Sequence, residues 1–265
     1  MASAKCWDPE VILFKKNEPR NVIMILNQPI QGETLNFLNG AWNKAILKMC
    51  VDGGAEALVR AVGQRIDSFI PDYLTGDFDS VSKDTLESFK AKGTVVVHTP
   101  DQDNTDFTKA LMVLKEVSGS RSLKVDHVVV LCSSFDRVDH MMAMFNTLHT
   151  SMEFLRVPVC LFMGNSLTWL LGPGRHQIAT PKHIAGEWCG LIPLGEPCLR
   201  VTTTGLKWNL RQFCRYGSQH AGGVKRPIEA ALLCLVQSSS RMPSQDKVTV
   251  NAGVLQYTLF HLFAS

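Results

Sequence analysis

Residues 93–117, "GTVVVHTPDQDNTDFTKALMVLKEV", place a short apolar run directly before a group of acids and then a longer amphipathic stretch. The run at 93–99 is rich in valine and too short for a helix, which predicts a strand. Apolar side chains in 104–117 recur at helical spacing and predict a helix with one apolar face. The stretch therefore predicts a strand, an acidic loop and a helix in succession.

The same alternation extends to both sides of this stretch. Further apolar runs that predict strands lie at 21–26, 45–52, 73–77, 126–132 and 157–163. Amphipathic segments that predict helices lie at 82–93 and 139–155. Because these strands are apolar throughout and alternate with helices, we expect an α/β domain with a parallel sheet covered on both faces.

The character of the chain changes near "LLGPGR" (170–175). The following residues are rich in glycine and proline and contain short alternating runs such as "RHQIAT" and "LRVTTTGLKW". This pattern is typical of an all-β domain. We therefore expect an α/β domain over 20–171 and a smaller β-sandwich domain over 172–265, with an irregular insertion at about 211–234.

The composition excludes several classes of protein. The 265 residues are 45% hydrophobic and 19% charged, as in an ordinary globular chain. The net charge of +3 comes from scattered basic residues, so no nucleic-acid partner is expected. No apolar stretch approaches the roughly 20 residues that span a bilayer, so no membrane partner is expected. Eight cysteines without metal-ligand spacing favour buried thiols and a cytoplasmic location.

Acidic residues follow the predicted strands at four places along the chain. They are Asp52 in "VDGGA", Asp77 and Asp79 in "GDFDS", Asp106 in "TPDQDNTDF" and Asp139 in "FDRVDH". The carboxyl ends of parallel strands form one crevice, so these acids should converge. Two like charges 4 Å apart cost about 4 kcal/mol at an effective dielectric of 20. A hard cation such as Mg²⁺, which prefers oxygen ligands, would relieve that repulsion.

Simpler interpretations of the same acids stay open. A single aspartate at a strand end is often a turn or N-cap residue, and Asp106 has Lys109 one helical turn away as a partner. In an extended "GDFDS", Phe78 would enter the core while Asp77 and Asp79 face the crevice.

The chain has neither a P-loop nor a GxGxxG motif. A phosphate substrate would therefore have to be held in another way. The candidates are a metal ion, Arg137, the amides of "DGGA" and Lys109.

Six motifs in this order resemble eukaryotic thiamine pyrophosphokinases: "IMILNQP" (23–29), "VDGGA", "GDFDS", "TPDQDNTDF", "RVDH" (137–140) and "VTTTGLKWNL" (201–210). The resemblance runs from about residue 20 to 210 and resumes weakly at 235–250. It implies transfer of a pyrophosphoryl group from ATP to the hydroxyl of thiamine, giving thiamine diphosphate and AMP. It also implies Mg²⁺ as cofactor and a homodimer with the active site at the subunit interface.

The resemblance also implies roles for individual residues. Asp77, Asp79 and Asp106 look like the Mg²⁺ ligands. The residues that match family positions around the nucleotide and the reacting phosphates are Asp52, Gln102, Thr105, Arg137 and Asp139. Trp208 matches the aromatic residue on which thiamine stacks, and Ser238 and Ser240 stand where the family has a thiamine-contacting strand. Which aspartate accepts the proton of the thiamine hydroxyl is left open.

The chain departs from the family pattern at two places. "CSSFD" (132–136) replaces a glycine-rich turn, which removes backbone freedom and adds bulk near the expected triphosphate. The second departure is the insertion at 211–234. Both favour an alternative, a degenerate paralogue that binds thiamine or nucleotide without turnover, whereas the intact acids favour an enzyme. A Mg²⁺-dependent nucleotide hydrolase is a third interpretation, but it leaves "TTTGLKWNL" unexplained.

Overall fold

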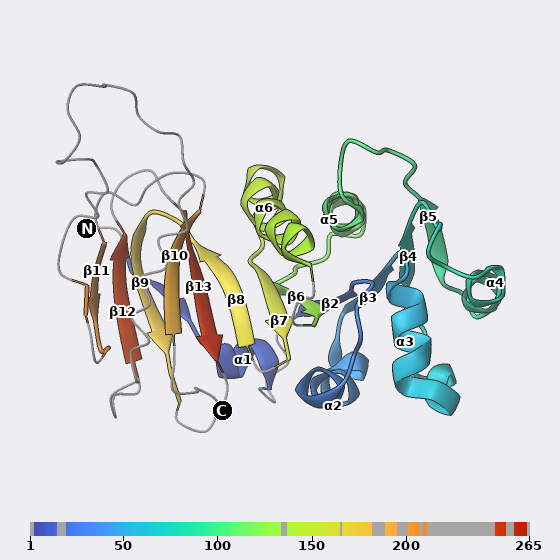
Figure 1. The fold of residues 1–265 in the computed structure, drawn as a ribbon, viewed down its shortest axis with the longest axis horizontal. Helices are drawn as coiled ribbons and strands as arrows, with labels where there is room; N and C mark the ends of the chain where they lie inside the picture. The colour runs from blue at the N-terminus through green and yellow to red at the C-terminus, as the bar shows by residue number, and fades with distance from the viewer. Residues whose placement is uncertain are drawn as a thin grey trace. The chain divides into compact units, whose positions relative to one another are not determined.

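The computed structural model describes residues 3–14, 20–133, 137–164, 166–181, 189–194, 201–206, 209–210, 247–252 and 257–263 (Figure 1). The chain divides into two compact units. The first, Glu10–Trp169, is called the α/β unit below. The second, Met1–Pro9 with Leu170–Ser265, is called the β unit. The predicted fold class, an α/β domain followed by a smaller all-β domain, is confirmed.

The sheet of the α/β unit runs in the order β8-β7-β6-β2-β3-β4-β5 (Figure 1). Its strands are β2 (Asn21–Ile25), β3 (Leu47–Val51), β4 (Tyr73–Gly76), β5 (Val95–His98), β6 (His127–Cys132), β7 (Val159–Met163) and β8 (Ser166–Leu171). All neighbours in this order pair in parallel, except that β7 and β8 are antiparallel. The strand β8 was not predicted. The carboxyl ends of the parallel strands therefore meet at one edge of the sheet.

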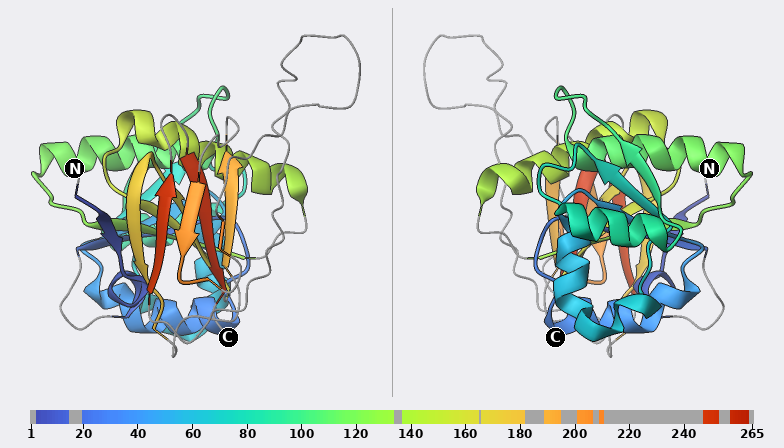
Figure 2. Two further views of the ribbon diagram at one scale, coloured as in Figure 1. Left: turned by 90° about the vertical axis from the view of Figure 1, so that its left-hand side faces the viewer. Right: turned by 90° about the vertical axis from the view of Figure 1, so that its right-hand side faces the viewer.

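The helices of this unit lie between the strands in the chain. They are α1 (Pro9–Leu13, whose first residue belongs to the β unit), α2 (Gly32–Ala41), α3 (Gly54–Val62), α4 (Lys83–Ala91), α5 (Asp106–Ser120) and α6 (Val138–Phe154), with 3-10 turns η1 (Trp42–Lys44) and η2 (Gly63–Ser68). Figures 1 and 2 show α5 and α6 side by side on one face of the sheet, with α2 and α3 on the other. Ser82 and Thr105 cap the N-termini of α4 and α5, because their hydroxyls accept the backbone N–H groups of Thr85 and Thr108.

The central strands β2 and β6 of the α/β unit are buried except at their first residue. In β2, the residues from Val22 to Ile25 are at most 1% exposed, and β6 is equally buried from Val128 to Leu131. The chain builds β2, β3, β4 and β5 outward in one direction and then returns to β6 on the other side of β2. This reversal places the topological switch point between β2 and β6, where such sheets bind ligands.

The β unit contains a four-stranded sheet in the order β1-β9-β12-β11, and its strands β10 and β13 pair antiparallel as the first two strands of the larger sheet. Its strands are β1 (Lys5–Trp7), β9 (Gly174–Ala179), β10 (Cys189–Leu194), β11 (Val201–Thr204), β12 (Lys247–Ala252) and β13 (Tyr257–Phe263). The strand β1 pairs in parallel with β9, with Lys5 opposite His176. Sequence reasoning started the first domain at residue 20 and did not foresee this N-terminal strand.

Among the described residues, no helix combines the length and the apolar composition needed to cross a bilayer.

A buried histidine fastens β1 to β9. Nε1 of Trp7 lies 3.0 Å from Nδ1 of His176, and Nε2 of His176 lies 2.8 Å from the carbonyl oxygen of Gly172. The indole can only donate and the carbonyl can only accept, so the imidazole is neutral and carries its proton on Nε2. Burial lowers the pKa of His176; the Gly172 hydrogen bond opposes this shift and the charge of Lys5 adds to it.

The β unit should therefore lose stability in mild acid. A lowered pKa means that the folded state binds fewer protons than the unfolded chain, so stability is full above the unfolded value of 6.5 and falls below it. Thermal unfolding from pH 7.5 to 5 should show a steeper loss for the natural protein than for His176→Gln. Identical pH profiles for the two proteins would contradict the role of His176.

Candidate functional site

Three carboxylates meet at the carboxyl edge of the α/β sheet. Asp52 follows β3, Asp77 follows β4, and Asp106 begins α5 after the loop that leaves β5. One carboxylate oxygen from each lies within 4.8 Å of the other two. We call these three residues the acid cluster. They converge because parallel strands bring their carboxyl ends to the same edge of the sheet.

Asp52 is the most buried member of the acid cluster. Only 6% of it is exposed, and Oδ1 has no hydrogen-bond partner among the residues that the structure describes. Its backbone is left-handed, with φ of 43°, and its N–H donates to the carbonyl of Thr75 at 2.7 Å. A buried carboxylate oxygen without a donor is costly, so this oxygen points to a ligand.

Two glycines allow the backbone around Asp52 to pack closely. Gly76 has φ of 150°, and a Cβ there would lie 2.9 Å from Cβ of Asp52. A Cβ on Gly54 would lie 2.3 Å from the carbonyl oxygen of Ile25. Gly76 therefore lets the end of β4 pass against Asp52, and Gly54 lets α3 start against the end of β2.

Asp77 is held by an amide from the acidic loop. Nε2 of Gln102 donates to Oδ2 of Asp77 at 3.1 Å and to the carbonyl of Pro100 at 3.3 Å. This hydrogen bond is the main reason that the pKa of Asp77 is lowered, against the opposing effect of burial. The N–H of Asp79 and the charge of Lys109 lower the pKa of Asp77 further. Asp77 is therefore an ionised carboxylate at neutral pH.

Asp106 pairs with a buried lysine. Nζ of Lys109 lies 2.8 Å from Oδ1 of Asp106, and it donates to the carbonyls of Thr99 at 2.8 Å and Asp101 at 2.7 Å. The interpretation that Asp106 pairs with Lys109 is thus confirmed. Nζ of Lys109 donates hydrogen bonds to the two carbonyls and forms an ion pair with Asp106, whose Oδ1 accepts no hydrogen bond from the described residues. A phosphate that approached Lys109 would therefore have to displace one of these three oxygens.

The expected geometry of "GDFDS" is wrong. The strand β4 ends at Gly76, and Phe78 has φ of 67°, which breaks the alternation of an extended chain. Phe78 is half-buried and stacks on His98, with ring centroids 5.7 Å apart, instead of entering the core. Asp79 is exposed, accepts from Oγ of Ser80 at 2.8 Å and lies outside the acid cluster.

The hydroxyl of Thr105 is used within the fold. It caps α5 and lies 2.9 Å from the hydroxyl of Thr108 and 3.2 Å from that of Thr147 on α6. The hydroxyls of Thr108 and Thr147 are 2.9 Å apart, so the three form one connected group. This group ties the start of α5, and with it Asp106, to the middle of α6.

Arg137 and Asp139 bind each other at the start of α6. Nε of Arg137 donates to Oδ1 of Asp139 at 3.1 Å, and both side chains are exposed. The pairing raises the pKa of Arg137 and lowers that of Asp139. A ligand that uses either side chain must first compete with this pairing.

Not every acid of "TPDQDNTDF" has a place in the site. Asp101 accepts from the N–H of Asp103 at 3.0 Å and from Nδ2 of Asn104 at 2.8 Å, so it is a turn residue. Several other predicted features lie outside the described residues: Trp208, Ser238, Ser240, 134–136 and the insertion at 211–234.

Sequence reasoning missed the polar side chains that follow β2. Oε1 of Gln28 accepts from the backbone N–H of Ser133 at 2.7 Å and from its hydroxyl at 3.3 Å, which joins the ends of β2 and β6 at the switch point. A Cβ on Gly53 would lie 2.3 Å from Nδ2 of Asn27. The feature of the sequence that could have revealed these side chains is the position of "NQ" directly after a buried strand.

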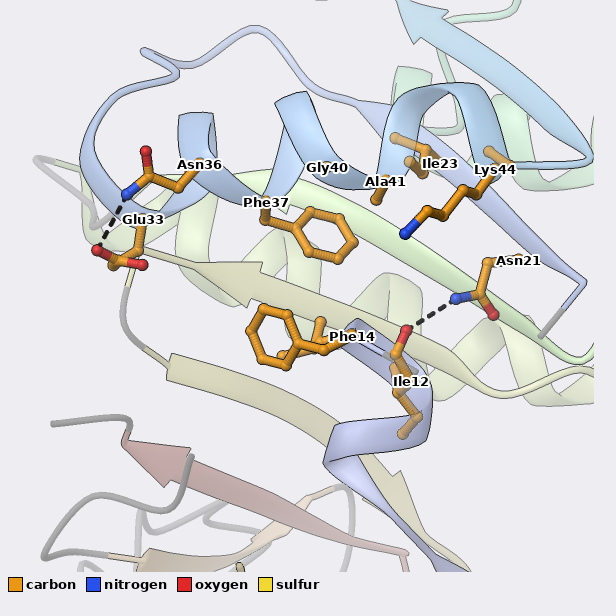
Figure 3. A pocket seen from close by; sticks show the side chains of 12 residues that line it. Ile12, Phe14, Asn21, Ile23, Glu33, Asn36, Phe37, Gly40, Ala41 and Lys44 are labelled. Carbon is orange, nitrogen blue, oxygen red and sulfur yellow. Dashed lines mark hydrogen bonds between the residues drawn. The ribbon is translucent and has the colours of Figure 1, made fainter. Parts of the chain in front are cut away.

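A cavity of about 190 Å³ lies elsewhere in the α/β unit. Figure 3 shows Phe14 and Phe37 facing it, with Lys44 and Asn21 at its side. Asn21, which donates to the carbonyl of Ile12 at 2.7 Å, is the first residue of β2. The acids follow the last residues of their strands, so the cavity and the acid cluster lie toward opposite edges of the sheet.

Two family models match the chain in sequence order. The first, "Thiamin pyrophosphokinase, catalytic domain", matches residues 38–161. The second, "Thiamin pyrophosphokinase, vitamin B1 binding domain", matches residues 175–220. The first match lies within the α/β unit and includes the acid cluster, and the second lies within the β unit.

Individual proteins are similar over most of the chain. Thiamine pyrophosphokinase 3 of Oryza sativa is 33% identical, covering 71% of this chain and 72% of the relative. Thiamine pyrophosphokinase 1 of Arabidopsis thaliana is 28% identical, covering 88% and 83%. The solved structure of thiamin pyrophosphokinase from Candida albicans has a TM-score of 0.78 at 23% identity, covering 100% of this chain and 94% of that one. That structural likeness establishes the fold.

The close contact at Gly76 leads to a test of the local geometry. Gly76→Ala should destabilise the α/β unit by about 1–3 kcal/mol, because a side chain there is strained and collides with Asp52. Thermal unfolding measures the loss. Gly119→Ala in α5 is the matched control: its Cβ would meet nothing within 4 Å, so stability should change by at most about 1 kcal/mol. Equal melting temperatures for Gly76→Ala and the natural protein would refute the close contact.

Proposed function

Because this chain belongs to the thiamin pyrophosphokinase family, we infer that it is an ATP-dependent diphosphotransferase. It transfers a pyrophosphoryl group from ATP to thiamine and releases thiamine diphosphate and AMP. The observation that carries this conclusion is the match to both family domains in sequence order. We propose that the two domains are 20–171, which binds nucleotide and metal, and 172–265, which binds thiamine.

We propose that Asp52, Asp77 and Asp106 hold Mg²⁺. Their carboxylates are the hard oxygen donors that this ion prefers, and the buried Oδ1 of Asp52 has no other partner among the described residues. Mg²⁺ bound there would screen the triphosphate and stabilise the negative charge that develops on AMP. Asp79, expected as a ligand, lies outside the acid cluster, so Asp52 is the better candidate for the third position.

The other residues of the edge position the reactants. The amide of Gln102 orients Asp77, and the cap at Thr105 fixes the start of α5 beside Asp106. We propose that Arg137 leaves Asp139 and binds a phosphate of ATP, because its exposed guanidinium can form two parallel hydrogen bonds to phosphate oxygens. Such positioning and charge neutralisation are the main requirements of phosphoryl transfer.

The thiamine site is a proposal from the family resemblance. Trp208 would stack on the cationic thiazolium or the pyrimidine ring, and Ser238 and Ser240 would donate hydrogen bonds. The same resemblance suggests a homodimer with the active site between subunits, and a cytoplasmic location is expected.

The proposed reaction is tested by following AMP. Full-length protein with ATP, Mg²⁺ and thiamine should release AMP, and omitting thiamine or adding excess EDTA should stop the release. Thiamine binding without AMP formation would favour the degenerate paralogue. Loss of ATP that does not depend on thiamine would favour the nucleotide hydrolase.

The acid cluster should be essential for turnover. Asp77→Asn and Asp106→Asn should each lower kcat by about 100-fold or more, since an amide is a poor ligand for a hard cation. Both variants should fold, because removing one of three like charges relieves repulsion. Asp84→Asn, an exposed acid in the first turn of α4, is the control and should keep the natural rate. A near-normal rate for either cluster variant would show that its carboxylate is not a metal ligand.

Trp208 should contribute to the binding of thiamine but not to the binding of ATP. Trp208→Ala should raise the KM for thiamine by about tenfold, because a cation–π contact in a desolvated site is worth roughly 1–2 kcal/mol. The KM for ATP should not change, and Trp208→Phe should retain most of the affinity. Steady-state kinetics with each substrate varied in turn would check this, and an unchanged KM for thiamine in Trp208→Ala would rule out stacking.

A further inference from the structure

We propose that Lys109 is the positioning residue of the acid cluster and that its buried ammonium sets how tightly the cluster binds a divalent cation. The inference rests on the metal site proposed above. It assigns to Lys109 a role in organising the ligands instead of the phosphate contact that its place in the sequence suggested.

The ammonium of Lys109 is buried among oxygens of the protein. Its side chain is 6% exposed, and Nζ lies within 2.8 Å of each of three oxygens: Oδ1 of Asp106 and the carbonyls of Thr99 and Asp101. The two carbonyls accept hydrogen bonds from Nζ, and Asp106 neutralises its charge as an ion pair. A lysine is rarely so buried unless its charge is paired, and here the pairing partner is a member of the acid cluster.

These contacts reach two of the three carboxylates. Lys109 binds Asp106 directly, since the two lie one turn apart on α5. Through the carbonyls of Thr99 and Asp101, Lys109 also fixes the loop that contains Gln102. Gln102 in turn donates to Asp77. Loss of the ammonium would therefore release Asp106 and loosen the support of Asp77 together.

Charge alone would have the opposite effect on metal binding. A positive group beside the acid cluster repels an incoming cation, so a lysine that acted only through its charge would weaken the metal site. A lysine that positions the ligands strengthens it, because ordered outer partners of metal ligands are typically worth about 10–100-fold in affinity. Whether the affinity for a divalent cation rises or falls when Lys109 is removed therefore distinguishes the two roles.

The test compares Mn²⁺ binding by full-length proteins without substrates, measured by electron paramagnetic resonance. Lys109→Met keeps an unbranched side chain as far as Cε and removes the ammonium, and it should bind Mn²⁺ about 10–100-fold more weakly than the natural protein. Lys48→Met is the matched control. It removes a half-buried lysine of β3 whose Nζ lies 3.8 Å from Asp72, and it should bind Mn²⁺ as the natural protein does.

Two further measurements keep the result interpretable. Circular dichroism shows whether Lys109→Met is folded, and amide hydrogen exchange should be faster over 99–106 in this variant and unchanged in Lys48→Met. If Lys109→Met does not fold, Lys109→Arg carries the test. Its planar guanidinium cannot direct three N–H groups from one nitrogen, so it should bind Mn²⁺ about 3–10-fold more weakly despite the retained charge.

Each outcome decides the proposal. Natural or tighter Mn²⁺ affinity in folded Lys109→Met, or natural affinity in Lys109→Arg, overturns the positioning role. If the natural protein itself binds no Mn²⁺, the metal site under "Proposed function" fails, and the role of Lys109 fails with it. AMP formation reports separately on the proposed reaction.

Discussion

Electrostatic repulsion among three carboxylates is the constraint around which the carboxyl edge of the α/β unit is organised. Each pair of such charges at about 4 Å is unfavourable by several kcal/mol in a partly screened site. The fold offsets this with donors placed on the individual acids: an amide on Asp77 and an ammonium on Asp106. Asp52 has no such donor among the described residues, which makes it the side chain that most needs a cation.

A single short loop supports both donors, which connects the chemistry to the topology. Residues 99–105 join β5 to α5 and carry both the carbonyls that hold Lys109 and the amide that holds Asp77. The hydrogen bonds among the hydroxyls of Thr105, Thr108 and Thr147 then connect the start of α5 to α6. The position of the acids thus depends on contacts between neighbouring elements and not on any one strand.

The fold class was predictable because strand and helix patterns alternate without interruption from 73 to 163. The helices α2 and α3 were missed, since "GETLNFLNGA" has a weak apolar stripe and "GAEALVRAV" follows a pair of glycines that reads as a turn. In the site, the convergence of acids was predictable from the parallel topology. Which of the aspartates would join the acid cluster was not predictable. A positive φ at Phe78 and another at Asp52 decide which carboxylates turn inward, and such backbone angles leave no periodic signal in a sequence.

The pairing of β1 with β9 has a consequence for biosynthesis. The two strands are separated by about 170 residues, as the contact between Cys6 and Gln177 shows. At elongation rates of about 5–20 residues per second, β1 is synthesised roughly 10–30 s before β9. During that interval most of the α/β unit is synthesised. β1 therefore pairs late, and the nascent chain must keep it from pairing with the edge of another sheet in the meantime.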